Sequence, residues 1–367
     1  MFNQAEALNK VLAKLELTSA RIGDEIPYWT RDGKFDDKTE TDICWWTNGF
    51  WPGILWLAYS QTKQQTYADW AVRVEEKLDN ALRNFYGLHH DVGFMWHISA
   101  VADYKLTGNQ TAAKRGYLAA SILASRFNHV GSFIRAWNDD HVGWAIIDCM
   151  MNLAILYWAS EYTKDPRFSH IAQAHSQTVI KNFIQDDGSA KHICEFNPFT
   201  GEYIQNFGGQ GYSPESAWSR GAAWALYGFA IGAKYTGRQD FVNTAKRVAR
   251  YFISHLPEDQ VPFADFKAPA DINIYKDSSA AAIAAGGLLL LSKLVVPEEQ
   301  ADYRMSAKKI IASLYENYTN WDEDEALIIK GCTAFHARGR ELETSLIYGD
   351  YFFLEALMQL NGFEGLF

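Results

Sequence analysis

This sequence has few cysteines, and none is placed for a disulfide framework or a structural metal site. It contains no C-x-x-C pair and no histidine at zinc-finger spacing. We therefore expect free thiols in a cytoplasmic protein. Cys149 lies in an apolar helix pattern, which predicts a buried small hydrophobe and not a nucleophile. The four cysteines are Cys44, Cys149, Cys194 and Cys332.

Long apolar runs are also missing. The most apolar stretch, 280–291, is too short to span a bilayer. The start, MFNQAEALNKVLAKL, has the pattern of an amphipathic helix and lacks the apolar region and cleavage site of a signal peptide. The sequence thus predicts no membrane partner.

Positive charge is scarce, and the motifs of nucleotide and metal chemistry do not occur. Lys and Arg total 34 against 44 Asp and Glu, a net charge of -10. Such a surface repels polyanions, which argues against nucleic acid and favours small, locally recognised acidic ligands. Without G-x-G-x-x-G, G-x-x-x-x-G-K-[ST], H-E-x-x-H or an acidic calcium loop, we expect no cofactor and no metal.

A turn pattern recurs four times along the chain. In each copy an apolar helix ends at a threonine, passes a short polar joint and restarts as a helix. Gly108, Gly237 and the Asp165-Pro166 pair are helix-ending residues at three of these joints. A fifth joint, without threonine, is expected near 294–297. The threonines are Thr62, Thr107, Thr163 and Thr236.

The helices on the two sides of each joint differ in their polarity. Those before the joints, such as AIIDCMMNLAILYWA, are apolar almost all round, whereas those after them have one apolar face. This alternation predicts six inner and six outer helices in an all-α (α/α)6 barrel, formed as a single domain over 1–367. Almost no strands are expected, and an open α-solenoid is the alternative.

The repeat also predicts which residues share one end of the barrel. At about 1.5 Å per residue, positions about 15 residues before each joint are one inner-helix length away. Long connections at 18–45, 128–143, 185–217 and 256–276 enter the inner helices at that end, where a ligand pocket is expected. The residues predicted to gather there are Trp46, Asp91, Asp148, Arg220, Ser279 and Asp350.

Asp148 and Asp91 are the candidate catalytic residues. Asp148 opens an inner helix among apolar neighbours, so burial should raise its pKa and suit it to a general acid. The alternative is that Asp148 caps the helix. Asp91, in GLHHDVGF, holds the equivalent place one hairpin earlier, and two acids at one pocket are typical of glycosidases.

Histidines and aromatic residues surround these acids in the sequence. His90 and His192 could orient the carboxylates, although a structural role is the commoner one for a loop histidine. Aromatic residues are 15% of the chain and gather before the inner helices, where their faces can stack on sugar rings. Gln210 and Arg220 flank Trp218; the arginine could bind a carboxylate or form a surface salt bridge.

Six strings resemble, in order, the unsaturated glucuronyl hydrolases of glycoside hydrolase family 88. The match runs from about 45 to 357, nearly the whole chain. The strings are TNGFWPGILWLAY, HHDVGFMW, IIDCMMNL, ESAWSRGAAWALYGFA, YKDSSAAAIAAGGLL and YGDYFFLEAL.

The resemblance implies a hydrolase that removes the 4,5-unsaturated uronic acid which polysaccharide lyases leave at a non-reducing end. The aspartate matching Asp148 protonates C4 of the vinyl ether and activates the water that adds at C5, and the one matching Asp91 supports the ring hydroxyls. His192 would assist Asp148. Substrate-binding positions implied by the match are His90, His192, Gln210, Trp218, Arg220, Trp224, Trp51, Trp137 and His336.

Some properties stay open from the sequence. Many members of the family read T-H-Q-G where this chain has Gly208-Gly209-Gln210-Gly211, so contacts to the second sugar differ. The partners implied are small unsaturated uronyl oligosaccharides of the chondroitin, hyaluronan or heparin type, bound by a monomer or homodimer. An unsaturated rhamnogalacturonyl hydrolase and a non-catalytic sugar-binding α/α protein are the alternatives.

Overall fold

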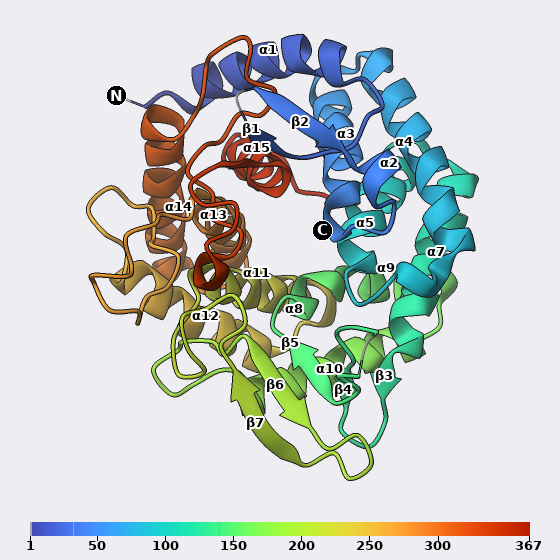
Figure 1. Cartoon of the computed structure of the whole chain (residues 1–367), viewed down its shortest axis with the longest axis vertical. Coiled ribbons are helices and arrows are strands. Elements are labelled where there is room, and N and C mark those ends of the chain that lie inside the picture. The colour runs from blue at the N-terminus through green and yellow to red at the C-terminus, as the bar shows by residue number, and fades with distance from the viewer. Residues whose placement is uncertain (1, 32, 139) are drawn as a thin grey trace.

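The computed structural model describes residues 2–31, 33–138 and 140–367. Residue 1 of the predicted N-terminal helix, and positions 32 and 139 within two predicted loops, lie outside this part of the chain. Over the described residues the helices form two concentric rings, seen end-on in Figure 1. The predicted (α/α)6 barrel is confirmed, and the solenoid alternative does not apply because the rings close.

Six inner and six outer helical segments alternate along the described chain (Figure 1). The inner ones are α3 (Phe50–Thr62), α5 (Val92–Trp96) continued by η3 (His97–Val101) and α6 (Ala102–Thr107), α8 (Cys149–Asn152) with α9 (Ala154–Thr163), α11 (Ser219–Thr236), α13 (Ser278–Ser292) and α15 (Ile347–Leu360). The outer ones are α1 (Gln4–Ile22), α4 (Gln65–Arg83), α7 (Gln110–Ser125), α10 (Arg167–Asn182), α12 (Gln239–Ser254) and α14 (Pro297–Asn317).

Burial follows the two patterns read from the sequence. Every residue of α13 and of α15 is buried, as a helix surrounded on all sides requires. In α12 the buried positions, among them Phe241, Ala245, Val248 and Phe252, follow helical spacing along one face. Cys149 is fully buried and burial raises the pKa of its thiol well above the usual value, so the prediction of an inert core cysteine is confirmed.

The four joint threonines make the same pair of hydrogen bonds. Each hydroxyl donates to the carbonyl four residues earlier, at 2.8, 2.9, 2.7 and 2.6 Å for Thr62, Thr107, Thr163 and Thr236. Each also accepts the backbone N–H two residues further on. The residue in between adopts the left-handed conformation at all four joints, as Gly108 and Gly237 do with φ of 79° and 68°.

The expectation of almost no strands was wrong for the long connections. They contain β1 (Pro27–Arg31), β2 (Lys34–Asp37), β3 (Phe127–Asn128), β4 (Phe133–Ile134), β5 (Trp144–Ile146), β6 (Ile193–Phe196), β7 (Tyr203–Phe207) and β8 (Ser345–Leu346). These pair antiparallel in the orders β2-β1-β8, β3-β4 and β5-β6-β7. The strands are too short to show an alternating pattern, and β1 pairs with β8 from the opposite end of the sequence.

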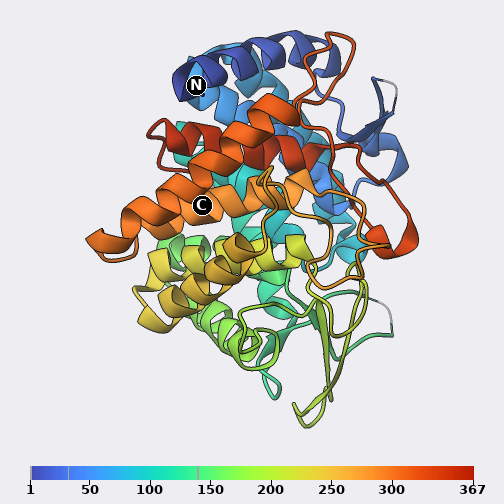
Figure 2. The same cartoon turned by 90° about the vertical axis from the view of Figure 1, so that its left-hand side faces the viewer.

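The connections divide between the two ends of the barrel as predicted. Figure 2 shows the strands and long loops on one side, and the short threonine joints lie opposite. The remaining short helical segments, α2 (Lys38–Thr41), η1 (Trp46–Gly49), η2 (Phe85–Gly87) and η4 (His336–Arg338), also belong to the long connections. Within the described residues, no helix combines the length and apolar character needed to cross a membrane.

Candidate active site

Asp91 and Asp148 stand at equivalent places, immediately before the inner helices α5 and α8. Neither side chain accepts a hydrogen bond from the first turn of its helix, so the capping alternative for Asp148 is wrong. Asp277, before α13, shows what a true cap does here, because its side chain accepts the N–H groups of Ser279 and Ala280. The two aspartates thus lie at the loop-rich end of the barrel without capping their helices.

Each carboxylate faces a buried histidine. His192 Nε2 lies 3.4 Å from Oδ2 of Asp148, and His90 Nε2 lies 3.2 Å from Oδ1 of Asp91. His90 is 0% exposed and His192 is 5% exposed. Among the described residues, neither Nε2 atom nor Asp148 Oδ2 has a well-aligned hydrogen-bond partner, so these buried polar atoms are available to a ligand.

The two aspartates differ in their protonation. Burial raises the pKa of Asp91 to about 7, and the charge of Asp148 acts in the same direction. Burial would also raise the pKa of Asp148, but His192, His90 and Arg220 outweigh it and hold that pKa below its usual value. The predicted rise for Asp148 is therefore wrong, because positively polarised groups from three other segments surround it.

Asn152 fixes Asp91 across two inner helices. Its Nδ2 donates to Asp91 Oδ1 at 3.0 Å, and its Oδ1 accepts the backbone N–H of Phe94 at 2.7 Å. The helices approach this closely because position 93 is glycine; a Cβ there would lie 2.5 Å from the Cα of Asn152. Asn152 was not predicted, although it lies one helical turn after Asp148 and so shares its face.

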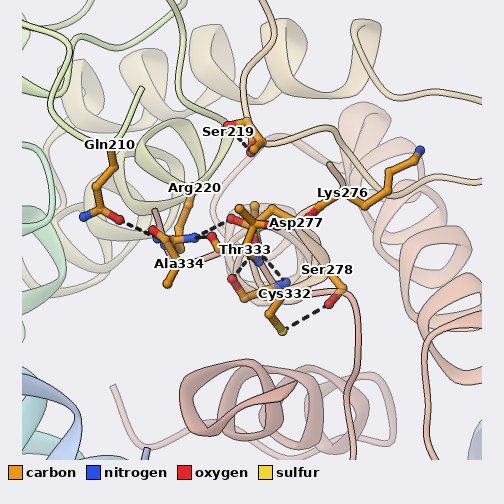
Figure 3. A network of polar contacts seen from close by, with 12 residues as sticks. Gln210, Ser219, Arg220, Lys276, Asp277, Ser278, Cys332, Thr333 and Ala334 are labelled. Atoms are coloured by element: carbon orange, nitrogen blue, oxygen red, sulfur yellow. Dashed lines mark hydrogen bonds and ion pairs between the residues drawn. The ribbon is translucent and has the colours of Figure 1, made fainter. Parts of the chain in front are cut away.

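Arg220 lies at the centre of a buried polar network, shown in Figure 3. Its Nη1 donates to the Asp277 carboxylate and to Thr333 O, and its Nη2 donates to Gln210 Oε1 at 2.7 Å and to Ala334 O at 2.6 Å. The guanidinium also stacks on Trp218, 4.6 Å from the ring centroid. Arg220 thus forms a buried ion pair and not a surface salt bridge, and its Nη atoms already have partners in the protein. It joins α11 to the loops before α13 and α15.

Gln210 is oriented by this network. Because its Oε1 accepts from Arg220, its Nε2 amide group points away from the arginine, as Figure 3 shows. Its backbone N–H donates to His192 Nδ1 at 2.9 Å. Gln210 therefore links Arg220 to the histidine beside Asp148, and it offers two N–H donors to a ligand.

The predicted aromatic residues take different positions. Trp218 packs on His192 with ring centroids 4.4 Å apart, and Trp137 lies edge-on to His90 at 6.0 Å. Trp224 is buried one turn deeper, between Phe94 and Phe352.

Two predicted residues do not touch the carboxylates. Trp51 donates from Nε1 to Gly23 O at 2.9 Å, which ties it to the end of α1. Trp46 is the tryptophan at this end of α3, in ring contact with Tyr348. His336 lies in η4, with Nε2 3.2 Å from Ile272 O.

Sequence reasoning also missed Asp277, Tyr348 and His89. Asp277 is the first residue of an Asp-Ser-Ser sequence, which indicates a helix N-cap. Nothing in that sequence indicates the ion pair of Asp277 with Arg220. Tyr348 is fully buried, its ring lies 5.4 Å from Arg220, and its hydroxyl has no partner among the described residues. His89 Nδ1 lies 3.5 Å from Asp91 Oδ2.

One group of potential metal ligands occurs within the described residues. The side chains of His89, His90 and Asp91 place a ligand atom each within 4.8 Å of one another. Two of the three side chains already have partners in the protein: His89 Nδ1 accepts the Asp91 N–H at 3.4 Å, and Asp91 accepts from Asn152. We assign no metal to them.

Known proteins share this fold and much of this sequence. The family model described as Glycosyl Hydrolase Family 88 matches residues 19–362. An unsaturated glucuronyl hydrolase of Bacillus sp. (strain GL1) is 36% identical over 97% of this chain and 96% of its own length. The crystal structure of that Bacillus enzyme superposes with a TM-score of 0.93 and covers 98% of this chain and 97% of the other.

Two further relatives are described together with a particular saccharide. An unsaturated chondroitin disaccharide hydrolase of Streptococcus pneumoniae is 33% identical over 96% of this chain and 91% of its own length. A variant of the unsaturated glucuronyl hydrolase of Streptococcus agalactiae, solved in complex with dGlcA-GalNAc6S, is 30% identical with a TM-score of 0.85. That match covers 99% of this chain and 93% of the other.

Proposed function

Since this chain belongs to the unsaturated glucuronyl hydrolases of glycoside hydrolase family 88, we propose that it removes the 4,5-unsaturated uronic acid from the non-reducing end of short, lyase-generated oligosaccharides. The observation that supports this most directly is the paired arrangement at one end of the barrel. Two buried aspartates, each facing a buried histidine, stand before adjacent inner helices.

In the proposed reaction Asp148 acts on the vinyl ether. Its carboxyl group gives a proton to C4, water adds at C5, and the carboxylate takes the proton that this water loses. The product is a hemiketal at C5, which opens and releases the neighbouring sugar together with an open-chain keto-uronate. Asp91 holds ring hydroxyls, and His192 Nε2, 3.4 Å from Asp148 Oδ2, supports the charge of Asp148.

Binding of the uronate is assigned to groups around these aspartates. The Nε2 donors of Gln210 face away from Arg220 and are placed for a substrate oxygen, while Arg220 acts through Gln210. Trp218 and Trp137, beside His192 and His90, offer apolar faces to the sugar rings. We also propose that His336, in the outer loop, and Trp224, beneath the pocket, contribute to substrate binding.

The proposed substrates are glycosaminoglycan-type disaccharides of the chondroitin, hyaluronan or heparin classes. The relatives support this range, because one is named for chondroitin disaccharides and another was solved with dGlcA-GalNAc6S. The net charge of -10 favours a short acidic substrate over a long polyanion. The rhamnogalacturonyl alternative shares the chemistry but needs a different neighbouring sugar.

The test is a spectrophotometric assay of the conjugated double bond. Unsaturated chondroitin, hyaluronan and heparin disaccharides, sulfated and unsulfated, are incubated with wild type and with Asp148→Asn. We expect wild type to abolish the ultraviolet absorbance and Asp148→Asn to lose activity by about 100-fold or more, because the amide cannot transfer a proton.

A matched control separates chemistry from folding. Asp187→Asn changes a carboxylate that pairs with Lys267 outside this cluster, and it should keep wild-type turnover. Turnover only of pectin-derived fragments would favour the rhamnogalacturonyl alternative. If no unsaturated uronide is consumed but sugars still bind, the protein is a sugar-binding module and the proposal fails.

We further infer that 1–367 acts as one catalytic domain in a reducing compartment. The N- and C-terminal helices are joined directly, since Gln4 Nε2 donates to Leu360 O at 3.0 Å and Asn361 Nδ2 donates to Gln4 O at 3.1 Å. All four cysteines are free thiols, which supports a cytoplasmic location.

A further inference from the structure

The backbone around His90 decides which ring nitrogen carries its hydrogen. Nδ1 lies 2.8 Å from the carbonyl oxygen of Ala136, and since a carbonyl only accepts, Nδ1 must donate. The ring is 0% exposed, and burial lowers the pKa of His90 to about 4. His90 is therefore neutral at neutral pH, and its Nε2, 3.2 Å from Asp91 Oδ1, is a bare acceptor.

His192 is held in the opposite way. The backbone N–H of Gln210 donates to Nδ1 at 2.9 Å, and since an N–H only donates, Nδ1 must be bare. Gly208 O also lies 3.2 Å from this nitrogen, but an Nδ1 that donated to it would have no lone pair left for the shorter contact with the Gln210 N–H. The hydrogen is left on Nε2, which lies 3.4 Å from Asp148 Oδ2.

The two carboxylates therefore face histidine nitrogens of opposite character: Asp91 faces a bare nitrogen and Asp148 faces an N–H group. An ionised Asp91 would face the bare Nε2 of His90, and two acceptors repel each other. Protonation of Oδ1 removes this repulsion, because it places a hydrogen between two acceptors that lie 3.2 Å apart, and Oδ1 still accepts the Asn152 N–H at 3.0 Å. His89 gives Asp91 no hydrogen through Nδ1, since that atom accepts the Asp91 N–H. Asp148, in contrast, faces an N–H and is stable as a carboxylate.

We propose that Ala136 and the 208–211 turn hold His90 and His192 in opposite tautomers, so that the free enzyme carries its proton on Asp91 and presents Asp148 as a carboxylate. The consequence for catalysis rests on the proposed function. Asp148 has to take a proton from solvent, as the anionic substrate enters beside it, before it can protonate C4. The water that adds at C5 returns this proton to Asp148, and product release frees it.

Gly209 is the residue that permits this arrangement. It has φ of 58°, and a Cβ built on it would lie 2.0 Å from His192 Nδ1. The turn is anchored from outside, because Asp265 accepts the N–H of Tyr212 at 3.0 Å and of Ala217 at 3.2 Å. Gly209 is therefore a positioning residue: in the turn conformation of this chain, a side chain at 209 would clash with the ring that faces Asp148.

The first test reads the tautomers in the free protein. Nitrogen NMR of histidine-labelled wild type distinguishes bare from hydrogen-bearing ring nitrogens, and spectra of His90→Gln and His192→Gln identify the signals. We expect a bare Nδ1 in His192 and a bare Nε2 in His90. His175 is an internal reference for the His192 pattern, because its Nδ1 accepts the Ile134 N–H at 3.1 Å.

Carbon NMR of labelled aspartate completes this measurement. At about pH 6, one unit below the Asp91 pKa of about 7, the signal lost in Asp91→Asn should be that of a protonated carboxyl group, and the one lost in Asp148→Asn that of a carboxylate. A hydrogen on His192 Nδ1, or the reverse order of the two acids, overturns the proposal. These spectra need no substrate, so a protein with the expected tautomers that consumes no unsaturated uronide contradicts only the proposed function.

The second test changes the turn. Gly209→Ala should lower kcat by about tenfold or more, with a smaller change in KM, and should alter the His192 nitrogen signals. Gly339→Ala is the matched control, since Gly339 has φ of 62° but nothing within 4 Å of a built Cβ. Unchanged signals and kcat in Gly209→Ala would refute the proposal.

A third variant pair keeps the proposal testable if Gly209→Ala does not fold. The side-chain amide of His192→Gln can replace the Nε2–H donor, whereas His192→Ala cannot. We expect His192→Gln to retain at least about tenfold more kcat than His192→Ala. Equal loss in the two variants would show that an N–H facing Asp148 is not required.

Discussion

At the scale of single residues, Asp91 and Asp148 show how similar positions acquire different chemistry. Both precede an inner helix and both are buried, yet the pKa of Asp91 is raised to about 7 and that of Asp148 is lowered. The difference comes from their surroundings: burial and the charge of Asp148 raise the pKa of Asp91, whereas His192, His90 and Arg220 outweigh burial at Asp148. Pairs of acids with diverging pKa values are typical of sites that move protons.

Arg220 illustrates a buried charge that acts through other residues. It is 2% exposed and its ion pair with Asp277 is completed by two backbone carbonyls and Gln210. Removing one member of such a network leaves an uncompensated charge, which costs about 3–5 kcal/mol. Its role in substrate binding is therefore expected to appear through Gln210.

We predict that Arg220→Lys raises KM more than it lowers kcat, because a lysine cannot hold Gln210 and both loops at once. The check is a double-mutant cycle with Gln210→Ala, measured as KM for the preferred disaccharide. If Arg220 acts through Gln210, the effect of Arg220→Lys on KM is much smaller in the Gln210→Ala background. Additive effects would indicate that Arg220 contacts the substrate itself.

At the scale of elements, the joint threonines end inner helices by a local mechanism. Each hydroxyl bonds backward to a helix carbonyl and forward to the N–H beyond the joint, while the intervening residue turns left-handed. These contacts involve residues at most four positions apart, so they form without help from tertiary structure. They lie at the end of the barrel opposite the aspartates.

We predict that Thr236→Val lowers the free energy of unfolding by about 1–2 kcal/mol, because it removes both hydrogen bonds of one joint. Chemical denaturation measures the change. Turnover should be unaffected, since α11 carries Trp218 and Arg220 at its other end. Thr200→Val is the control: its hydroxyl also makes two hydrogen bonds, both to Glu202, but they are exposed to water, so its loss should leave the stability within about 0.5 kcal/mol of wild type.

At the scale of the whole molecule, the barrel buries several carboxyl groups whose pKa values are raised. Glu355 in α15 accepts a hydrogen bond from Tyr227 of α11 at 3.0 Å, and burial raises the pKa of Glu355 to about 8. Burial also raises the pKa of Asp350 to about 7 and that of Glu75 to about 8. In the unfolded chain these groups ionise at their usual, lower pKa values.

We predict that the free energy of unfolding falls as the pH rises from about 6.5 to 8. In this range the folded state binds more protons than the unfolded state, so the stability conferred by these acids decreases with pH. The buried histidines, whose folded pKa values are lowered, act oppositely but only below about 6.5. Denaturation at several pH values should show a shallower slope for Glu355→Gln than for wild type. An equal slope would mean that Glu355 is ionised in the barrel.

The barrel and the end of it that carries the site follow from local properties of the sequence. Helical periodicity, burial all round or on one face, and the threonine joints are local properties, and each inner helix has a nearly constant length. Counting back from a joint therefore placed Asp91, Asp148 and Arg220 at one end before any contact was known. The six strings also identified the family, because they preserve the residues around those positions.

The contacts of these residues depend on the folded chain. Arg220 is paired by Asp277, Thr333 and Ala334, which lie far along the chain, and Trp51 donates to Gly23 at the end of α1. Strand β1 pairs with β8 from the other end of the sequence. The pKa of Asp148 is lowered by His192, which accepts a hydrogen bond from Gln210 in the 208–211 turn. A local pattern predicts that a side chain is buried, but its charge and tautomer depend on partners that only the folded chain brings within reach.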